Sequence, residues 1–208
     1  MHHKKCKRPF QTSYPLVLAS KSPRRFELLK GLGLTFSVEE ADIEELDQSA
    51  GLEPAQMVVE NAKLKAFFTA QKFPNHFVIG ADTCVYIDGQ ILGKPKSMEE
   101  AFNMLKLLSG KWHNVFTGFC VCCKEKDIIR VKVVDTKVLL YAFNEDIIRA
   151  YCATEEPYDK AGAYAVQAVG GFMIRKINGS YTNVVGLPIS ELLDVLLDLR
   201  VIKPCVKD

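Results

Sequence analysis

The sequence lacks an excess of charge of either sign, and it lacks any long apolar run. Its 27 Lys and Arg residues nearly balance 25 Asp and Glu residues, which leaves a net charge of +2 over 208 residues. Bulk positive charge, a common basis of binding to nucleic acids and anionic membranes, is therefore missing. No apolar stretch approaches the ~20 residues that a membrane-spanning helix needs. We predict neither a nucleic acid nor a membrane as partner.

Cysteine is present, but without the pattern of a disulfide framework or a metal site. The seven cysteines are odd in number, and Cys120, Cys122 and Cys123 share one strand-like run. A zinc site would need a second ligand cluster at suitable spacing, and the sequence shows none. In a strand, Cys120 and Cys122 would share one face and Cys123 would point to the other. We expect reduced structural thiols and therefore a cytoplasmic protein.

Three common motifs of nucleotide-binding proteins and hydrolases are absent. The chain has no Gly-x-x-x-x-Gly-Lys-Ser/Thr phosphate loop, no Gly-x-Gly-x-x-Gly fingerprint and no Gly-x-Ser-x-Gly elbow. These absences argue against the phosphate-loop, dinucleotide-binding and serine-hydrolase classes. The one histidine in an interesting setting, His113, is interpreted as structural rather than as a base.

Domain organisation is simple. Residues 1–13 are predicted to be a basic tail, whose charges are Lys4, Lys5, Lys7 and Arg8. This tail lacks the apolar core of a signal peptide. The rest of the chain shows no repeat, low-complexity run or linker, and its length suits one domain of ordinary size. We predict a single domain over residues 14–203.

Apolar periodicity and capping residues predict the helices. The first helix begins at Pro23 and ends at Gly31 or Gly33. Further helices are expected over residues 53–73, 98–109, 145–151 and 190–199. The buried face of the second helix is expected to carry Met57, Val58, Ala62, Leu64 and Phe68.

Runs rich in β-branched and aromatic residues predict the strands. They are expected over residues 16–19, 35–40 and 77–87, and as antiparallel strands between 114 and 143. Asp88-Gly89 is a hairpin signal, and residues 166–177 are predicted to be strands around a bulge at Gly170-Gly171. Helices and strands alternate, so we predict one mixed α/β domain.

The most informative segment joins the first strand to the first helix. The apolar run ends at Ser20, and Ser22 and Pro23 suit the N-cap and the first helical position. The unpaired amides of this helix start, with Arg24 and Arg25, favour a bound anion. Phosphate suits two guanidiniums because Arg grips phosphate oxygens bidentately. A basic helix start on the plain surface is the alternative.

Asp82 is the most unusual carboxylate. It lies within an apolar strand between Gly80-Ala81 and Thr83, where an unpaired charge would be costly. It could act as a general base for water or hold a divalent metal against phosphates. The alternative is a structural Asp that caps a turn or pairs with a buried Arg.

Three lysines stand in confined settings, namely Lys65, Lys94 and Lys160. Each alone could be a solvated surface charge, but together with the two arginines they would balance a triphosphate. The acidic stretch from Asp42 to Asp47 is most simply a solvated loop. Its carboxylates could also assist a metal, and the sequence leaves the metal ligands open.

Six motifs now occur in order at suitable spacing. They are Ala19-Ser20-x-Ser-Pro-Arg-Arg-x-Glu-Leu-Leu29, Gly80-Ala-Asp-Thr83, Gly93-Lys-Pro95, Ser109-Gly-x-x-His113-x-Val-x-Thr117, Asp159-Lys-Ala-Gly-Ala-Tyr-Ala-Val-Gln167 and Asn178-Gly-Ser-Tyr-x-Asn-Val-Val-Gly-Leu-Pro188. The chain thereby resembles the Maf (septum formation protein) family of nucleoside triphosphate pyrophosphatases from about Leu16 to the last helix. The resemblance implies a two-lobed α/β fold with a mixed central sheet flanked by helices, related to the inosine triphosphate pyrophosphatases.

The resemblance also implies an enzyme that hydrolyses a nucleoside triphosphate to the monophosphate and diphosphate with a divalent metal, Mg²⁺ or Mn²⁺. Asp82 matches the family's proton acceptor, and Arg24, Thr83 and Gln167 match positions used for substrate selection. Five further residues match polar positions of the substrate cleft, which would contact phosphates: Ser20, Arg25, Lys65, Lys94 and Lys160. A homodimer is compatible with the resemblance.

Ala-Asp-Thr83 and Gln167 look like the branch that acts on dTTP and UTP. The branch that prefers 7-methyl-GTP typically shows Ser-Asp-Gln instead, together with a Trp before Arg in the first motif. Ala168 departs from the glycine often found after this glutamine, and Cys84 replaces a usual aliphatic residue. We predict a dTTP/UTP pyrophosphatase. The alternatives are a 7-methyl-GTP pyrophosphatase and a nucleotide-binding regulator of cell division with incidental hydrolysis.

Overall fold

The central feature of the fold is one long mixed sheet. A computed structural model describes residues 8–205 of the chain. The strands follow the order β3-β2-β4-β6-β7-β8, and β5 pairs with β4; β2 is parallel to β3 and β4, and the other pairs are antiparallel. Their bounds are β2 Leu16–Ala19, β3 Ser37–Val38, β4 Phe77–Ile87, β5 Gln90–Leu92, β6 Trp112–Cys123, β7 Ile128–Leu140 and β8 Ile174–Asn178.

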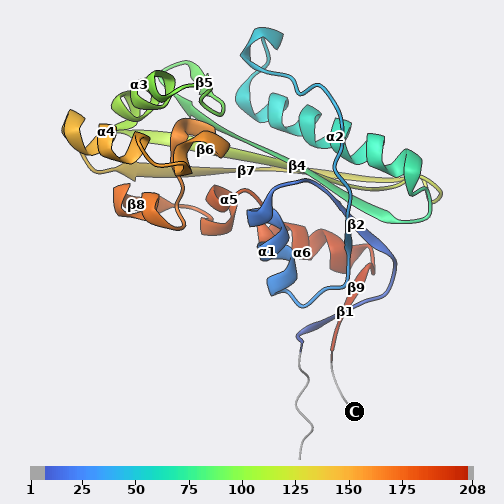
Figure 1. Cartoon of the computed structure of the whole chain (residues 1–208). Coiled ribbons are helices and arrows are strands. Elements are labelled where there is room, and N and C mark those ends of the chain that lie inside the picture. The colour runs from blue at the N-terminus through green and yellow to red at the C-terminus, as the bar shows by residue number, and fades with distance from the viewer. Residues whose placement is uncertain (1–7, 206–208) are drawn as a thin grey trace, which may run out of the picture.

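Helices cover both faces of this sheet. The α-helices are α1 Pro23–Gly31, α2 Pro54–Lys72, α3 Met98–Leu108, α4 Glu145–Cys152, α5 Tyr181–Val185 and α6 Ile189–Asp198. Short 3₁₀ helices are η1 Gln48–Ala50, η2 Glu156–Asp159, η3 Ala161–Ala163 and η4 Val169–Met173. Figure 1 shows α2 over one face of the long strands and α1 with α6 over the other. The predicted mixed α/β architecture is confirmed.

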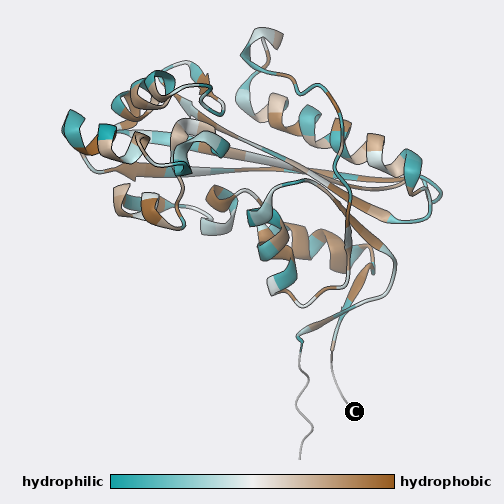
Figure 2. Cartoon of the chain, in the orientation of Figure 1, coloured by the Kyte–Doolittle hydropathy of each residue, from teal (hydrophilic) through white to brown (hydrophobic). Residues whose placement is uncertain are grey.

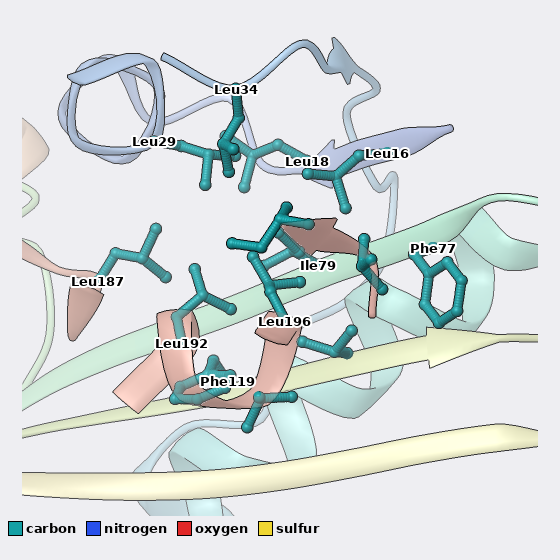
Figure 3. Packing of buried hydrophobic residues seen from close by; sticks show 14 of the residues in the cluster. Leu16, Leu18, Leu29, Leu34, Phe77, Ile79, Phe119, Leu187, Leu192 and Leu196 are labelled. Carbon is teal, nitrogen blue, oxygen red and sulfur yellow. The ribbon is translucent and has the colours of Figure 1, made fainter. Parts of the chain in front are cut away.

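Alternation along β4 assigns its side chains to these two layers. Phe77 and Ile79 point into the cluster beneath α1 and α6, which Figure 3 shows together with leucines of β2, α1 and α6. Val78 belongs instead to the cluster packed against α2. This period of two is that of a strand buried on both faces. Figure 2 shows the apolar residues concentrated on α6 and along stretches of the central strands.

A second large core lies at the other end of the long strands. It joins Val85 and Ile87 of β4 to residues of α3 and α4, such as Leu105 and Ile148. The two cores share β4, β6 and β7 but contain different segments of each strand. The domain therefore has two lobes connected by continuous strands.

Two glycines allow α2 to lie unusually close to the sheet. A Cβ at Gly80 would stand 2.3 Å from the carbonyl oxygen of Ala62, and one at Gly118 would stand 2.7 Å from the backbone of Val58. Neither distance is compatible with a side chain. Close approach is thus built into β4 and β6 opposite the middle of α2.

The predicted buried face of α2 was partly wrong. Met57, Val58 and Ala62 are buried, but Leu64 and Phe68 are 41% and 36% exposed. The close contact with the sheet explains this difference, because the stripe that touches the sheet carries small residues, Ala62, Ala66 and Ala70. The larger side chains lie outside that contact.

The segment 166–177 was also predicted incorrectly in part. Strand β8 begins only at Ile174, and residues 169–173 form the 3₁₀ helix η4 rather than a strand with a bulge. The carboxylate of Glu156 accepts hydrogen bonds from the amides of Val169 at 3.1 Å and Gly170 at 2.7 Å. These amides are satisfied locally and need no strand partner.

Other predictions about local structure are confirmed. Ser22 caps α1 with Pro23 at its start, and Asp88-Gly89 forms the turn between β4 and β5. The predicted strand 35–40 is shorter, with only Ser37–Val38 in β3. The thiols of Cys120 and Cys122 lie in the cluster on the α2 side and that of Cys123 in the cluster on the other side, as predicted.

The two ends of the described chain lie side by side. Strand β1, Phe10–Thr12, pairs antiparallel with β9, Ile202–Pro204, in a separate two-stranded sheet. β1 thus falls within the predicted tail, while Lys4, Lys5 and Lys7 lie outside the described residues. The boundary at residue 14 stays a prediction. Within residues 8–205, no helix combines the length and apolar character needed to cross a membrane.

Candidate active site

The candidate site opens at a gap in the pairing of β4. On one edge, β2 pairs with residues 77–80 of β4 and β5 pairs with residues 85–87. The opposite edge pairs with β6 along residues 78–86. Among the residues that the structure describes, none forms a strand next to residues 81–84 on the first edge. A cleft of about 1150 Å³ adjoins them.

All nine predicted site residues line this one cleft. They are Ser20, Arg24, Arg25, Lys65, Asp82, Thr83, Lys94, Lys160 and Gln167. They come from the β2–α1 junction, α2, β4, the segment after β5 and the segment between η2 and η4. Elements far apart in the sequence thus meet at the gap. Their individual roles stay predictions.

Asp82 is held firmly by two residues of α2. Lys65 Nζ lies 2.8 Å from Asp82 Oδ1, and Asn61 Nδ2 donates to Oδ2 at 2.9 Å. Asp82 is 7% exposed, and Lys65 is equally buried. The partners of Asp82 are therefore a lysine and an amide from one face of α2, and not the buried arginine that was the alternative. Because a carboxylate oxygen can accept more than one hydrogen bond, both oxygens keep capacity for a water molecule.

Lys65 also contacts a second carboxylate. Its Nζ lies 3.0 Å from Glu45 Oε1, in addition to the contact with Asp82. Glu45 belongs to the predicted acidic loop, and its side chain is 49% exposed. One ammonium group therefore brings together a buried and a half-exposed carboxylate at the cleft.

Arg25 is directed mainly into the protein. Its Nε donates to the carbonyl of Gly186 at 2.8 Å, and its Nη1 donates to the carbonyl of Ala81 at 2.9 Å and to Ser20 Oγ at 3.3 Å. Its Nη2 donates to Thr83 Oγ1 at 3.0 Å. Four of its five N–H groups are thus used, which leaves one for a substrate oxygen. Burial lowers the pKa of this guanidinium, and the nearby Asp82 opposes that effect.

Arg24 points across the cleft to the opposite lobe. Its Nη1 lies 2.8 Å from Asp159 Oδ2, and its Nη2 donates to the Asp159 carbonyl at 3.3 Å. Lys160 contacts the same carboxylate and donates to the Glu156 carbonyl at 2.6 Å. Asp159 therefore lies between two of the predicted substrate-binding cations.

Lys94 and Gln167 differ from the other site residues in making no hydrogen bond or ion pair within residues 8–205. Lys94 follows β5 and is exposed. Gln167 precedes Ala168, whose backbone has φ 61° and ψ −145°. That region of conformational space is essentially restricted to glycine. The loop that carries Gln167 is thus strained at the residue after it.

Two neighbouring groups are poor candidates for acid–base chemistry at neutral pH. Burial, with a smaller effect of the Asp82 charge, raises the pKa of the Cys84 thiol to about 12. Burial lowers the pKa of His113 to about 4, and its Nε2 lies 2.7 Å from the hydroxyl of Tyr164. His113 is 2% exposed. These surroundings support the structural interpretation of His113.

The described residues fit a divalent metal only in part. Within residues 8–205, no three His, Cys, Asp or Glu side chains converge as a complete ligand set. Glu45 and Asp82 nevertheless meet at Lys65. Mg²⁺ is commonly held by one or two carboxylates plus substrate phosphates, so these two residues suit a metal that arrives with the triphosphate.

The sequence also contained signals for two residues that were missed. Asn61 stands four residues before Lys65, so both side chains leave the same face of α2 toward Asp82. Asp159 directly precedes Lys160 in the motif that ends at Gln167, yet its contact with Arg24 joins residues 135 positions apart. Only the first of these two signals is local.

The chemistry of this cleft indicates the class of ligand and the type of reaction. A buried carboxylate at a strand gap, faced by arginines and lysines from both lobes, suits a polyphosphate ligand that is to be attacked by water. The family model described as "Maf-like protein" matches residues 15–199. The chain therefore belongs to the Maf family.

Similar curated proteins carry one name. A dTTP/UTP pyrophosphatase of Syntrophus aciditrophicus is 48% identical over 184 residues, which cover 88% of this chain and 89% of that protein. Those of Desulfotalea psychrophila and Geotalea uraniireducens are 45% and 46% identical, covering 93% and 89% of this chain and 98% and 95% of theirs. A solved nucleoside-triphosphatase / dITP/XTP pyrophosphatase from Mycobacterium abscessus is 10% identical, with a TM-score of 0.42 over 89% of this chain and 98% of that chain.

Proposed function

We propose that the protein hydrolyses nucleoside triphosphates, chiefly dTTP and UTP, to the monophosphate and diphosphate. The observation that carries this proposal is Asp82, fixed by Lys65 and Asn61 at the open edge of β4 within a cleft lined by cations. Membership of the Maf family supports the reaction. The shared name of the relatives supports the substrates.

In the proposed reaction, Asp82 accepts a proton from water as that water attacks the α-phosphorus. The bond from the α-phosphorus to the bridging oxygen breaks, and diphosphate leaves with the bond electrons. A base must lie within hydrogen-bond reach of the water, and the two donors on Asp82 hold its carboxylate in one orientation for this task. Lys65 also supplies positive charge beside the reacting centre.

The leaving diphosphate would be balanced by cations of both lobes. Lys94 is available without loss of a protein contact, whereas Arg24 and Lys160 must exchange Asp159 for substrate. Preorganised positive groups of this kind stabilise the charge that develops on the leaving phosphates. The cleft therefore has both committed and exchangeable cations.

A divalent cation, Mg²⁺ or Mn²⁺, is part of the proposal. Glu45 and Asp82 would hold it together with the phosphates. When bound, it would supply Lewis-acid stabilisation of phosphate oxygens.

Base selection is assigned to the neighbourhood of Gln167. Its amide offers one donor and one acceptor group, which can match the edge of a uracil or thymine base. Arg24 and Thr83 line the same cleft and are proposed to contribute to selection. A cytoplasmic location is proposed from the buried free thiols, such as Cys120 and Cys152. The homodimer compatible with family resemblance stays a prediction.

Diphosphate release from a panel of nucleoside triphosphates, measured with Mg²⁺ and with Mn²⁺, tests the proposal. We expect the highest kcat/KM with dTTP and UTP. A preference for 7-methyl-GTP would change the substrate and keep the reaction. Binding of nucleotides without turnover would favour the regulator and contradict the proposed enzyme.

A further inference from the structure

Behind the cleft, five residues close a ring of hydrogen bonds. Arg25 Nη2 donates to Thr83 Oγ1 at 3.0 Å, and the hydroxyls of Thr83 and Thr117 lie 2.9 Å apart. Thr117 Oγ1 donates to the carbonyl of Asn183 at 3.0 Å, and the amide of Gly186 donates to that carbonyl at 2.9 Å. Arg25 Nε donates to the carbonyl of Gly186 and completes the ring. The ring joins α1, β4, β6 and α5.

The donors in this ring have a defined direction. A carbonyl can only accept, so the hydroxyl proton of Thr117 points to Asn183. Thr117 must then accept from Thr83, which uses the only proton of the Thr83 hydroxyl. The other acceptor near Thr83 is the Gly186 carbonyl, at a longer 3.5 Å. Thr83 therefore accepts from Arg25 and has no proton left for a substrate.

The far side of the ring is buried and anchored. Thr117 and Asn183 are both 0% exposed, and neither lines the cleft. The side-chain amide of Asn183 donates through Nδ2 to the carbonyl of Val115 and to Thr136 Oγ1, each at 2.9 Å. Thr117 lies directly opposite Thr83 in the pairing of β4 with β6. The orientation of Thr83 thus depends on groups that no substrate can reach.

We propose that Thr117 is a positioning residue for substrate selection. Its hydroxyl orients Thr83, and through Thr83 it places the guanidinium of Arg25 at the cleft. Without this hydroxyl, Thr83 is free to turn its proton to Gly186 or to the cleft, and Arg25 loses a defined acceptor. This inference rests on the proposed function, because it explains how that function distinguishes one base from another.

The test compares the ratio of kcat/KM for UTP to that for CTP. The two nucleotides share sugar and phosphates, so the ratio reports on the base and is insensitive to the fraction of folded enzyme. For Thr117→Val, which keeps the shape of the side chain and removes the hydroxyl, we expect a ratio about tenfold smaller than in the wild type. Thr117→Ser, which keeps the hydroxyl, should restore the wild-type ratio.

Thr69→Val provides the matched control. Thr69 is 0% exposed on α2, lies outside the cleft, and has a hydroxyl without a hydrogen-bond partner among residues 8–205. The wild-type ratio should persist in this variant. If Thr117→Val fails to fold, Thr117→Ala and Thr117→Ser replace the comparison, with the small ratio expected only for Ala.

The outcomes separate the two proposals. A wild-type enzyme that does not prefer UTP to CTP contradicts the proposed function itself. A wild-type preference that is unchanged in Thr117→Val, or in Thr117→Ala where Val does not fold, overturns the role of Thr117 alone. An equally reduced ratio in Thr69→Val would also overturn it, because any buried hydroxyl would then matter.

Discussion

Asp82 and Thr83 are neighbours in β4, yet the two faces of the strand give them opposite surroundings. The partners of Asp82 are Lys65 and Asn61, which are buried but line the cleft themselves. Thr83 is tied to Thr117, which is fully buried behind the cleft. The face toward α2 therefore presents a cluster of paired charges, Asp82, Lys65 and Glu45, at the cleft itself. On the face toward α1, Thr83 is held in place by hydrogen bonds to Arg25 and to the buried Thr117.

This difference follows from the geometry of a strand. Successive side chains point to opposite faces, so one step along β4 moves from the contact with α2 to the contact with α1. Both faces reach the same cleft because residues 81–84 have an open edge. The charged side chain of Asp82 and the hydrogen-bonded hydroxyl of Thr83 therefore lie on opposite faces although they are adjacent in sequence.

The largest effect is expected from a substitution that pushes α2 away from the sheet. In Gly80→Ala, the new Cβ would meet the Ala62 carbonyl at 2.3 Å, so α2 must move away from the sheet. We expect a loss of about 3 kcal/mol in the free energy of unfolding, measured with urea. Gly31→Ala is the control, because its Cβ would meet nothing within 4 Å. Equal stability of the two variants would refute the close approach of α2.

Asp82→Asn removes the negative charge of the Asp82 side chain while keeping the shape of that side chain. We expect kcat to fall about 10²- to 10⁴-fold with an unchanged circular dichroism spectrum, because the amide cannot accept the proton from water. Asp88→Asn is the control for charge, since Asp88 pairs with Lys111 at 3.0 Å on the exposed β4–β5 turn. Near-normal turnover of Asp82→Asn would exclude it as the base.

Glu45→Gln removes a second negative charge on the α2 side of the cleft, and a smaller effect is expected. The variant should need about three- to tenfold more Mg²⁺ for half-maximal activity, because one of the two carboxylates at Lys65 is lost. Its kcat at saturating Mg²⁺ should stay within a few-fold of the wild type. Glu44→Gln, on the same loop but outside the cleft, should leave the Mg²⁺ dependence unchanged. An identical Mg²⁺ titration for both variants would contradict the proposed role of Glu45 in metal binding.

The smallest expected effect concerns the loop of Gln167, which belongs to neither face of β4. Ala168→Gly should raise the free energy of unfolding by about 1 kcal/mol, because the backbone at φ 61° and ψ −145° suits only glycine. Ala153→Gly, in a right-handed conformation, should instead lower it. Urea unfolding distinguishes the two, and a destabilised Ala168→Gly would mean that the loop is not strained.

Much of this comparison could be predicted from the sequence. Asp82 in an apolar strand and the cap of α1 at Ser22 are local patterns, and both were confirmed in position. The two faces of β6 were also correctly predicted from the alternation of its cysteines. The roles of the site residues remain predictions that mutation must test.

What could not be predicted depends on contacts distant in the sequence. The sequence suggested Arg25 as a phosphate ligand, but it could not show that four of its donors are used by Gly186, Ala81, Ser20 and Thr83. The exposure of Leu64 and Phe68 was missed for a related reason. Helical periodicity identifies apolar residues, but the close contact of α2 with Gly80 decided which stripe is buried.

The gap in β4 also sets a length scale for the molecule. The five steps along β4 from Gly80 to Val85 span about 16 Å at ~3.3 Å per strand residue. Gly80 pairs with Ala19, the last residue of β2, and Val85 pairs with Leu92 of β5. The extent of the open edge of β4 at the cleft is therefore defined by where two paired strands stop. Lengthening β2 by two residues would instead cover the edge at Asp82, which makes strand length a determinant of access to the Asp82 carboxylate.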